Sequence, residues 1–151
     1  MQPVFPIAID KAVIPETIDT VPNPSLTDKL VQIIDPEFSS VCPKTGLPDY
    51  GRVIVRYIPN ASCVELKAWK LYLRSYYGVG IFHEAATQRI TENFVKSVFP
   101  KWVNITIDWG ARGGLHTTTS VTWDCNEGYI ANTEGFHGEV FVNHAKNWHN
   151  M

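Results

Sequence analysis

The chain has 151 residues, a length that predicts a single domain able to bury a core without disulfide bonds or a structural metal. Hydrophobic residues make up 44% of it and charged residues 19%, which is typical of a globular protein and excludes a disordered one. The formal net charge of -2 argues against a surface that coats nucleic acid, because such surfaces are basic.

The cysteines and the start of the chain bear on where the protein works. Cys42, Cys63 and Cys125 form no close pair and no Cys-x-x-Cys motif, so they predict free thiols and not a disulfide framework. The first residues contain prolines and an acid where a signal peptide needs an unbroken apolar stretch. No run of about 18 apolar residues is present to span a membrane. We therefore expect a cytoplasmic protein without membrane partners.

The chain begins with a proline-rich segment and then a first strand. Residues 1–28 show no hydrophobic periodicity, and we expect an extended arm that lies on its own domain or on a neighbouring subunit. Residues 29–151 are predicted to form one domain, whose tail after residue 125 we cannot assign. Lys29–Asp35 is a candidate first strand, and the stretch 36–51 is rich in turn residues. Residues 52–59 alternate strictly and predict a second strand.

Two amphipathic helices are expected next. The first has an apolar face with helical spacing and is ended by Gly78 and Gly80. The second is predicted from Phe82 to Phe99 and is stopped by Pro100. The residues expected on the two inner faces are Leu66, Trp69, Leu73 and Tyr76 in the first helix, and Ala86, Ile90, Phe94 and Val98 in the second.

Two further strands complete the predicted order. Residues 103–109 alternate, and a threonine-rich strand is expected over 115–124. The order is strand, strand, helix, helix, strand, strand. Short connections between consecutive strands predict an antiparallel sheet with both helices on one face, an α+β fold.

A cysteine in a sharp loop is the first candidate for chemistry. Cys42 precedes Pro43, and two prolines and a glycine fold the following residues back, so that Asp49 can approach the sulfur. An isolated cysteine is more often a small buried hydrophobe. The alternative is a nucleophile with a neighbouring acid.

Three other features are ambiguous when each is taken alone. Lys67, Lys70 and Arg74 share one helical stripe, which suits a polyphosphate but is also typical of a solvated helix face. His83 and Glu84 begin a helix, where they serve catalysis or simply cap it. Arg112 precedes two glycines between strands, as in a ligand-binding loop or an ordinary hairpin. No Gly-x-Gly-x-x-Gly follows a strand, so a dinucleotide would be held without a Rossmann turn.

Taken together, these segments resemble the QueF-type nitrile reductases of the tunnelling-fold superfamily, which includes GTP cyclohydrolase I. The resemblance covers residues 38–114 and includes, in the family's order, FSSVCPKTGLPDYG, RYIPN, VELKAWKLYL, FHE and RGG. The segment 65–72 fits the family signature Glu-(Ser/Leu)-Lys-(Ser/Ala)-apolar-Lys-(Leu/Tyr)-aromatic at every position. Each motif is weak alone, but five in register are specific.

The resemblance implies a reaction and a role for each matching residue. The substrate would be 7-cyano-7-deazaguanine (preQ0), reduced to its aminomethyl product preQ1 with two NADPH. Cys42 would form a covalent thioimide, Asp49 would donate a proton, and His83 would assist. The residues implied to bind the base are Val64, Glu65, Leu66, His83 and Glu84, and those implied to hold NADPH are Lys67, Lys70 and Arg112. The family fold has the same ββααββ order, assembled through sheet edges into barrel-like rings, with a decamer expected and active sites between subunits.

Elementary chemistry agrees with these roles. A nitrile is too poor an electrophile to accept hydride unaided, so covalent capture divides one difficult step into easier ones. Asp49 can protonate the nitrile nitrogen only when it holds a proton itself. The carboxylate of Glu84 matches the paired N–H donors of a guanine-like edge, and a base without those donors would leave the carboxylate unpaired.

Several alternatives stay open. Cys125, His137, His144 and His149 are a conceivable zinc cluster, although their spacing is not that of a compact site. A related branch of the family keeps the cysteine but acts as an amidinotransferase on preQ0 in tRNA, and it lacks the two-lysine signature. A zinc-dependent cyclohydrolase and a non-catalytic purine-binding protein are further alternatives. The sequence does not say whether the product serves queuosine in tRNA or a base in DNA.

Overall fold

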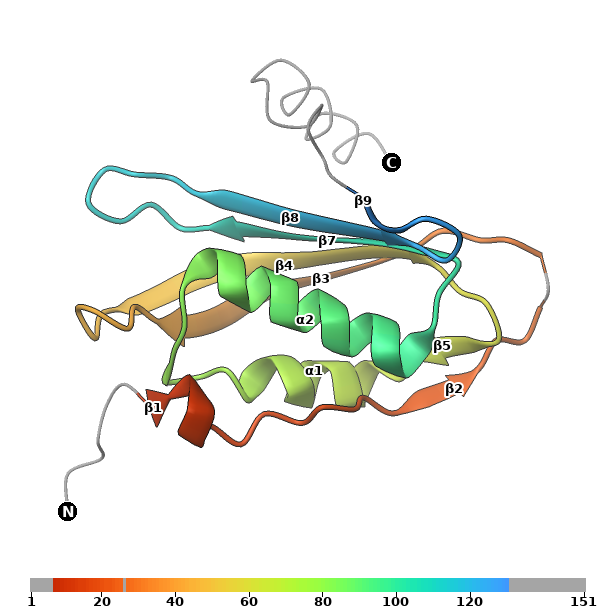
Figure 1. The fold of residues 1–151 in the computed structure, drawn as a ribbon, viewed down its shortest axis with the longest axis horizontal. Helices are drawn as coiled ribbons and strands as arrows, with labels where there is room; N and C mark the ends of the chain where they lie inside the picture. The colour runs from red at the N-terminus through yellow and green to blue at the C-terminus, as the bar shows by residue number, and fades with distance from the viewer. Residues whose placement is uncertain (1–6, 26, 131–151) are drawn as a thin grey trace.

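The computed structural model describes residues 7–25 and 27–130, which fold into one sheet covered on one face by two helices (Figure 1). The seven-stranded sheet has the order β1-β6-β3-β4-β7-β8-β9, and β2 and β5 form a separate two-stranded sheet. The elements are β1 (Ile7–Ala8), a 3-10 helix (Ile9–Lys11), β2 (Thr20–Pro22), β3 (Val31–Val41), β4 (Pro48–Ile58), β5 (Ser62–Val64), α1 (Leu66–Arg74), β6 (Val79–Gly80), α2 (His83–Val98), β7 (Trp102–Trp109), β8 (Thr118–Asp124) and β9 (Gly128–Ile130).

The predicted order of the long elements is confirmed. β3, β4, α1, α2, β7 and β8 follow one another as expected, and the pairs β3–β4, β4–β7 and β7–β8 are antiparallel. The sheet is not purely antiparallel, because the two-residue strand β6 pairs in parallel with both β1 and β3. These short strands have no sequence pattern of their own.

Alternation along the strands decides which face is covered. On β4, Val53, Val55 and Tyr57 point toward the helices and are almost completely buried. The inner stripe predicted for α2 is confirmed, since Ile90 and Phe94 are 0% exposed. In α1 the predicted face is right except for Leu66, which is 63% exposed because it occupies the first helical position, at the rim of the core.

The predicted strand ends are wrong around the first hairpin. β3 continues beyond Asp35 to Val41, and β4 already begins at Pro48, so much of the supposed turn region 36–51 is strand. Pro36 lies at an irregularity in the register between Asp35 and Phe38, where a missing N–H is tolerated. β8 begins at Thr118 and not at residue 115, because Arg112 and Leu115 close a tight turn first.

The N-terminal arm lies along the domain. β2 pairs with β5, and Ile14 and Ile18 are buried in the core beside α2. The Ile18 N–H donates to Ser97 Oγ at 2.9 Å, which fixes the arm against the last turns of α2. The boundary at residue 28 stays a prediction. Within the described residues, no helix has the length and apolar character needed to cross a membrane.

Candidate active site

The strand β3 delivers Cys42 to the tip of the first hairpin. The Cys42 N–H donates to the Leu47 carbonyl, and the Gly46 N–H donates to the Cys42 carbonyl, both at 2.9 Å. Cys42 is only 6% exposed and forms no disulfide. Phe38, Ser40 and Cys42 follow the period of two and therefore share the face that carries the helices.

Asp49 lies on the same face of the neighbouring strand. It pairs with Ser40 in the β3–β4 register and is 6% exposed. Its Oδ1 lies 2.7 Å from an Arg112 guanidinium nitrogen, and its Oδ2 lies 3.2 Å from His83 Nε2. Asp49 is therefore buried between a permanent cation and an imidazole ring, each within ion-pair distance of one of its oxygens.

His83 is the first residue of α2, and its ring is clamped from one side. The imidazole stacks on the Trp109 indole with centroids 3.9 Å apart and planes 8° from parallel. The indole Nε1–H of Trp109 donates to Thr119 Oγ1 at 3.0 Å. Thr87 Oγ1 in turn contacts both Thr119 Oγ1 and the His83 carbonyl. The stack fixes the plane of the imidazole, so its Nε2 is held toward Asp49.

Two buried polar atoms beside Cys42 and Asp49 have no hydrogen-bond partner in the described part of the chain. They are Ser40 Oγ and His83 Nε2. The 3.2 Å approach of Nε2 to Asp49 is an ion-pair distance, but its direction does not make a hydrogen bond. Because buried polar atoms are normally satisfied, both atoms indicate where a polar ligand can bond.

The surroundings of Cys42 favour its thiolate. The pKa of Cys42 is lowered from 9.0 to about 7, chiefly by a hydrogen bond from the Thr45 side chain and then by the Thr45 and Lys44 backbones. Burial acts in the opposite direction, and Arg112 adds a further hydrogen bond that lowers the pKa. The donors outweigh the burial. A thiol with a pKa near 7 is about half ionised at neutral pH.

Glycines at two places support this geometry, one through a close approach and the other through its backbone angles. A side chain at Gly51 would meet Ile107 Cγ2 at 3.1 Å and Trp109 Cε3 at 3.4 Å, so β4 passes directly beside the indole that supports His83. Gly113 and Gly114 have φ of +61° and +80°, which two consecutive glycines adopt without strain. This turn holds Arg112 at the base of its loop.

Glu84, the residue after His83, lines a cavity. The cavity measures about 390 Å³ and lies between the first turns of α2 and the edge of β8. Hydroxyl and amide side chains surround it, and its lining residues are Glu84, Thr87, Gln88, Thr117, Thr118, Thr119, Ser120 and Val121. A carboxylate in a polar cavity of this volume suits a flat heterocycle with N–H donors.

The structure does not bring every predicted residue to this end of the sheet. The Val64 N–H donates to the Tyr57 hydroxyl at 3.1 Å, and Tyr57 lies eight residues beyond Asp49 on β4. At about 3.3 Å per residue the separation is roughly 26 Å, and on the order of 20 Å remains after the reach of the tyrosine side chain. Val64, Glu65 and Leu66 therefore cannot contact the same base as Cys42 within one chain.

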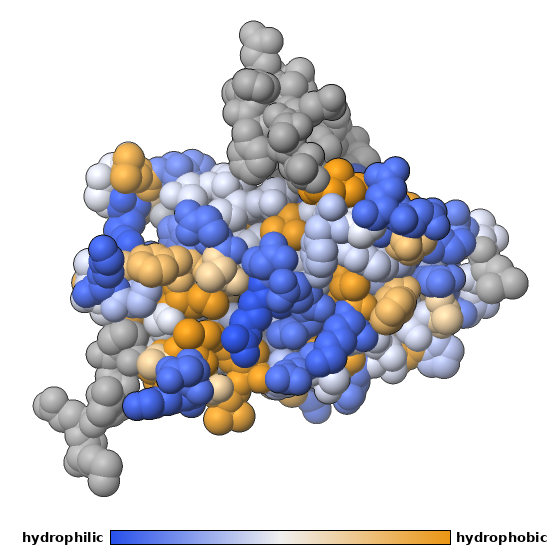
Figure 2. Space-filling model, viewed as in Figure 1, coloured by the Kyte–Doolittle hydropathy of each residue, from blue (hydrophilic) through white to orange (hydrophobic). Residues whose placement is uncertain are grey.

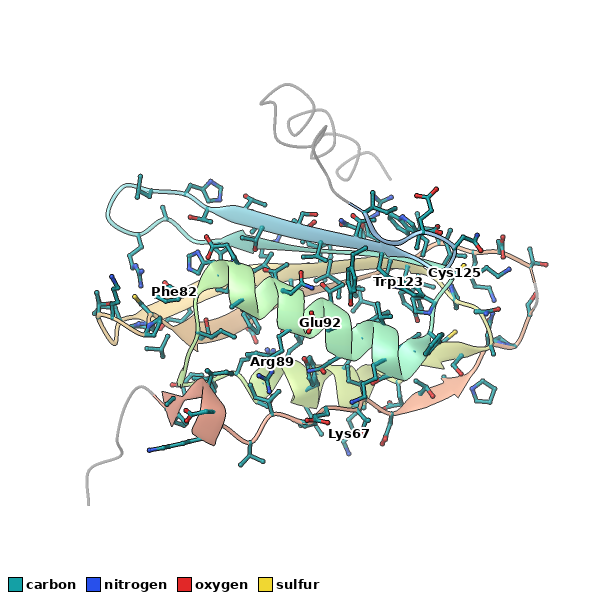
Figure 3. The ribbon with its side chains drawn as sticks, viewed as in Figure 1. Lys67, Phe82, Arg89, Glu92, Trp123 and Cys125 are labelled. Atoms are coloured by element: carbon teal, nitrogen blue, oxygen red, sulfur yellow. The ribbon has the colours of Figure 1, made fainter. Side chains whose placement is uncertain are left out.

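The two predicted lysines also belong to the far end. Lys67 and Lys70 are exposed on α1, and Figure 3 shows Lys67 away from Phe82, which immediately precedes His83. Arg74, the third cation of the stripe, forms a salt bridge with Asp35 at 2.6 Å. Exposed residues of α2, including Glu84, Glu92 and Lys96, contribute to the hydrophilic surface that Figure 2 shows over this helix. Lys67 and Lys70 are free to meet a phosphate, but Arg112 of the same chain cannot join them.

Glu65 has a structural role in the described fold. Its two carboxylate oxygens accept hydrogen bonds from the N–H groups of Lys67 at 3.0 Å and Ala68 at 2.7 Å, so it caps α1. These donors lower the pKa of Glu65, with the Ala68 amide the larger cause. Because both of its carboxylate oxygens are engaged in this cap, Glu65 would contact a ligand mainly through its backbone.

Three residues beside the site were not predicted from the sequence. Ser40 would have been found by extending the alternation of β3 to Cys42. Trp109 and Thr45 gave no local signal, because the first acts through a stack and the second through the shape of a loop. Three residues of the alternative zinc cluster, His137, His144 and His149, lie outside the described residues. Among residues 7–25 and 27–130, no three His, Cys, Asp or Glu side chains group to hold a metal.

Comparisons with known proteins agree with the geometry. The family model described as QueF-like protein matches residues 48–127. The chain is 44% identical over 114 residues to an NADPH-dependent 7-cyano-7-deazaguanine reductase of Chloroherpeton thalassium, covering 75% of this chain and 98% of that protein. It is 41% identical to the enzyme of that name from Chlorobaculum parvum, covering 76% and 97%. A crystal structure of the archaeosine synthase QueF-Like in the apo form aligns with a TM-score of 0.60 and 25% identity, covering 66% and 96%.

Proposed function

The chain belongs to the QueF-like family, and on that premise we propose that it reduces the nitrile of preQ0 to the aminomethyl group of preQ1 with two NADPH. Relatives that carry the reductase name match this chain at 41–44% identity over nearly their whole length. The observation on which the proposal depends is the meeting of Cys42, Asp49 and His83 at one end of the sheet.

Cys42 begins the reaction as the nucleophile. Its sulfur lone pair forms a bond to the nitrile carbon, one π pair of the nitrile moves to nitrogen, and that nitrogen takes a proton to give a thioimide. The lowered pKa of the thiol makes the nucleophile available near neutral pH.

Asp49 provides for the proton in two stages. Asp49, which lies 2.7 Å from the Arg112 guanidinium, is placed to accept the proton that the Cys42 thiol loses. It then returns that proton to the nitrile nitrogen, so thioimide formation needs no external acid. The role of Asp49 as proton donor stays a prediction. His83, held by Trp109, is placed to relay a proton between Asp49 and the substrate.

NADPH, which Lys67 and Lys70 would hold, would supply the hydride for the thioimide carbon and then for the imine that follows. Between the two additions the C–S bond breaks and Cys42 leaves as a thiolate. Asp49 and His83 provide the protons that the nitrogen takes up as it becomes an amine. Lys67 and Lys70 are exposed and suited to the phosphates of the dinucleotide. Arg112 stays a prediction for that role.

The base is bound by elements from both ends of the fold. Glu84 accepts the paired N–H donors of the deazaguanine edge in the cavity beside α2. Val64, Glu65 and Leu66 can contact the same base only from a second copy of the chain, because they lie about 20 Å away in their own. We therefore place complete sites between subunits of a homo-oligomer, with the decameric ring expected of the family. We place the enzyme in the cytoplasm, where free thiols persist.

The covalent step gives the most direct test. The purified protein is expected to oxidise NADPH only when preQ0 is present and without added metal. Mixed with preQ0 alone, it should gain the mass of one preQ0 per chain, because the adduct forms before any hydride transfer. Cys42→Ala is expected to lose both the adduct and the activity. Cys125→Ala, which changes an exposed cysteine, is the matched control. Activity retained by Cys42→Ala would refute the mechanism.

A second activity is suggested by the structural similarity to an archaeosine synthase. That protein is 25% identical to this chain, against 44% for a reductase. The two exposed lysines of α1 support the reductase, since they fit a dinucleotide. An amidinotransferase would modify preQ0-containing tRNA without oxidising NADPH, so supplying both substrates separately distinguishes the two activities.

A further inference from the structure

Arg112 occupies a position that cofactor binding does not explain. The Arg112 N–H donates to the Leu115 carbonyl at 3.0 Å, and the Leu115 N–H donates back at 3.1 Å, so the residue begins a closed two-glycine turn. From this fixed backbone its guanidinium reaches Asp49 at 2.7 Å, and it is also one of the groups that lower the pKa of the Cys42 thiol. It is 39% exposed, whereas Asp49 is buried. The turn thus aims one cation at the two reacting groups.

We propose that Arg112 is a catalytic residue of thioimide formation, in which one guanidinium holds the Asp49 carboxylate and stabilises the Cys42 thiolate. This proposal rests on the proposed function and deepens it, because the role concerns the covalent step and not the binding of NADPH. A guanidinium suits the task, since it offers five N–H donors and does not lose its charge.

Charge balance explains why a cation is needed there. When the thiol gives its proton to Asp49, the negative charge passes to the sulfur on the same face, since the β4 position of Asp49 neighbours Cys42 diagonally across the hairpin. A cation that reaches both groups therefore stays beside the charge in either position. Arg112 comes from the β7–β8 turn, His83 from α2 and Lys44 from the loop that carries Cys42. Among these three groups, Arg112 combines a permanent charge, a contact to Asp49 at 2.7 Å and a lowering effect on the pKa of the Cys42 thiol.

The role makes a prediction that cofactor binding does not. If Arg112 served only NADPH, its loss would not change a step that occurs without NADPH. If it stabilises the thiolate, Arg112→Gln should slow formation of the preQ0 adduct about tenfold or more at pH 7. The pH at which adduct formation is half maximal should also rise. Arg112→Lys keeps the charge but not the fork of donors, so it should recover part of the rate.

The experiment uses two readouts on the full chain. Rapid quenching and intact mass spectrometry follow the preQ0 adduct without NADPH across pH 5.5–9. Alkylation of Cys42 by iodoacetamide, located by peptide mass mapping, reports the thiolate without any substrate. Arg52→Gln is the control. Arg52 is an exposed residue of β4 three positions after Asp49, so its side chain points to the opposite face of the sheet. Melting curves verify that each variant is folded.

The outcomes separate the two proposals. A slower adduct and a raised alkylation midpoint in Arg112→Gln, with both unchanged in Arg52→Gln, support the role of Arg112. Wild-type adduct rates and midpoint, with only the KM for NADPH raised, overturn it and assign Arg112 to the cofactor. A wild-type protein that forms no preQ0 adduct contradicts the proposed function, while the alkylation profile still decides whether Arg112 acts on the thiol.

Discussion

At the scale of single residues, the reactivity of the site depends on donors around one sulfur atom. Cys42 is nearly buried, and burial by itself would make its thiol harder to ionise. The Thr45 hydroxyl and the amides of Lys44 and Thr45 reverse this effect. The Pro43–Pro48 loop therefore does more than present the cysteine, since its folded shape supplies the donors.

Removing the largest of these donors should be visible in the pH dependence. Thr45→Val deletes the hydroxyl while keeping the branched shape, so the Cys42 pKa should rise from about 7 toward its ordinary value of 9.0. The reactive thiolate dominates above the pKa and is lost as pH falls below it. The variant should thus be alkylated and form adduct at wild-type rates only at higher pH. The exposed Cys125 of the same protein is the internal control. An unchanged midpoint for Cys42 would show that the hydroxyl is not a donor to the sulfur.

The individual side chains of the site were predictable only in part. Cys42, Asp49 and His83 stood out because their motifs resemble those of a family. The stack of His83 on Trp109 and the reach of Arg112 to Asp49 join segments 26 and 63 residues apart in sequence, and no local pattern encodes such contacts. These contacts arise from tertiary packing, so the sequence shows the residues that make them but not which residues meet.

At the scale of elements, the sequence predicted the long helices and strands, with α2 and β7 correct to within one residue at each end, but it missed ends of β3, β4 and β8. The stripe of α2 and the alternation of β4 are strong because each repeats over several turns or pleats. The ends of β3 and β4 were missed because prolines and a glycine normally interrupt strands. Here Pro36 lies at a register irregularity and Pro48 is the first residue of β4, so neither proline ends the hairpin.

The cap of α1 should contribute stability that depends on pH. The folded state lowers the pKa of Glu65, because the Ala68 and Lys67 amides bond its ionised form. The stabilisation is therefore present above the ordinary glutamate pKa and disappears as pH falls through the lowered folded value. Glu65→Gln should melt a few degrees below the wild type at pH 7, and the gap should close below about pH 4. Circular dichroism melts at both pH values, with Glu127→Gln as a surface control, give the measurement; a gap that widens in acid would contradict the assignment.

At the scale of the whole molecule, the sheet separates two halves of one site. Cys42, Asp49, His83 and Arg112 meet at one end, while Val64 and the lysines of α1 lie at the other. The distance follows from the length of β4, which no side-chain movement can shorten. A reaction that needs both ends must therefore take place across two chains.

Mixing two impaired variants tests this arrangement. Cys42→Ala lacks the nucleophile, and a chain with Lys67→Ala and Lys70→Ala lacks the proposed phosphate contacts, so each alone should be severely impaired. Refolded together, they should regain about a quarter of wild-type turnover, because a random pair draws an intact half from each chain with that frequency. The activity of each mixture is measured as NADPH oxidation. A maximum of activity when the two variants are mixed in equal amounts supports sites shared between chains. A mixture no more active than the sum of its parts would place each site within one chain.

The tight passage of β4 beside Trp109 has a consequence for how this protein can diverge. Even the smallest side chain at position 51 would crowd Ile107 Cγ2 at 3.1 Å and the Asp108 carbonyl oxygen at 3.3 Å, in the part of β7 that leads directly into the indole under His83. Substitutions should therefore be tolerated at most positions on the outer face of the hairpin but not at position 51. A glycine with no chemistry of its own should persist as long as the enzyme does.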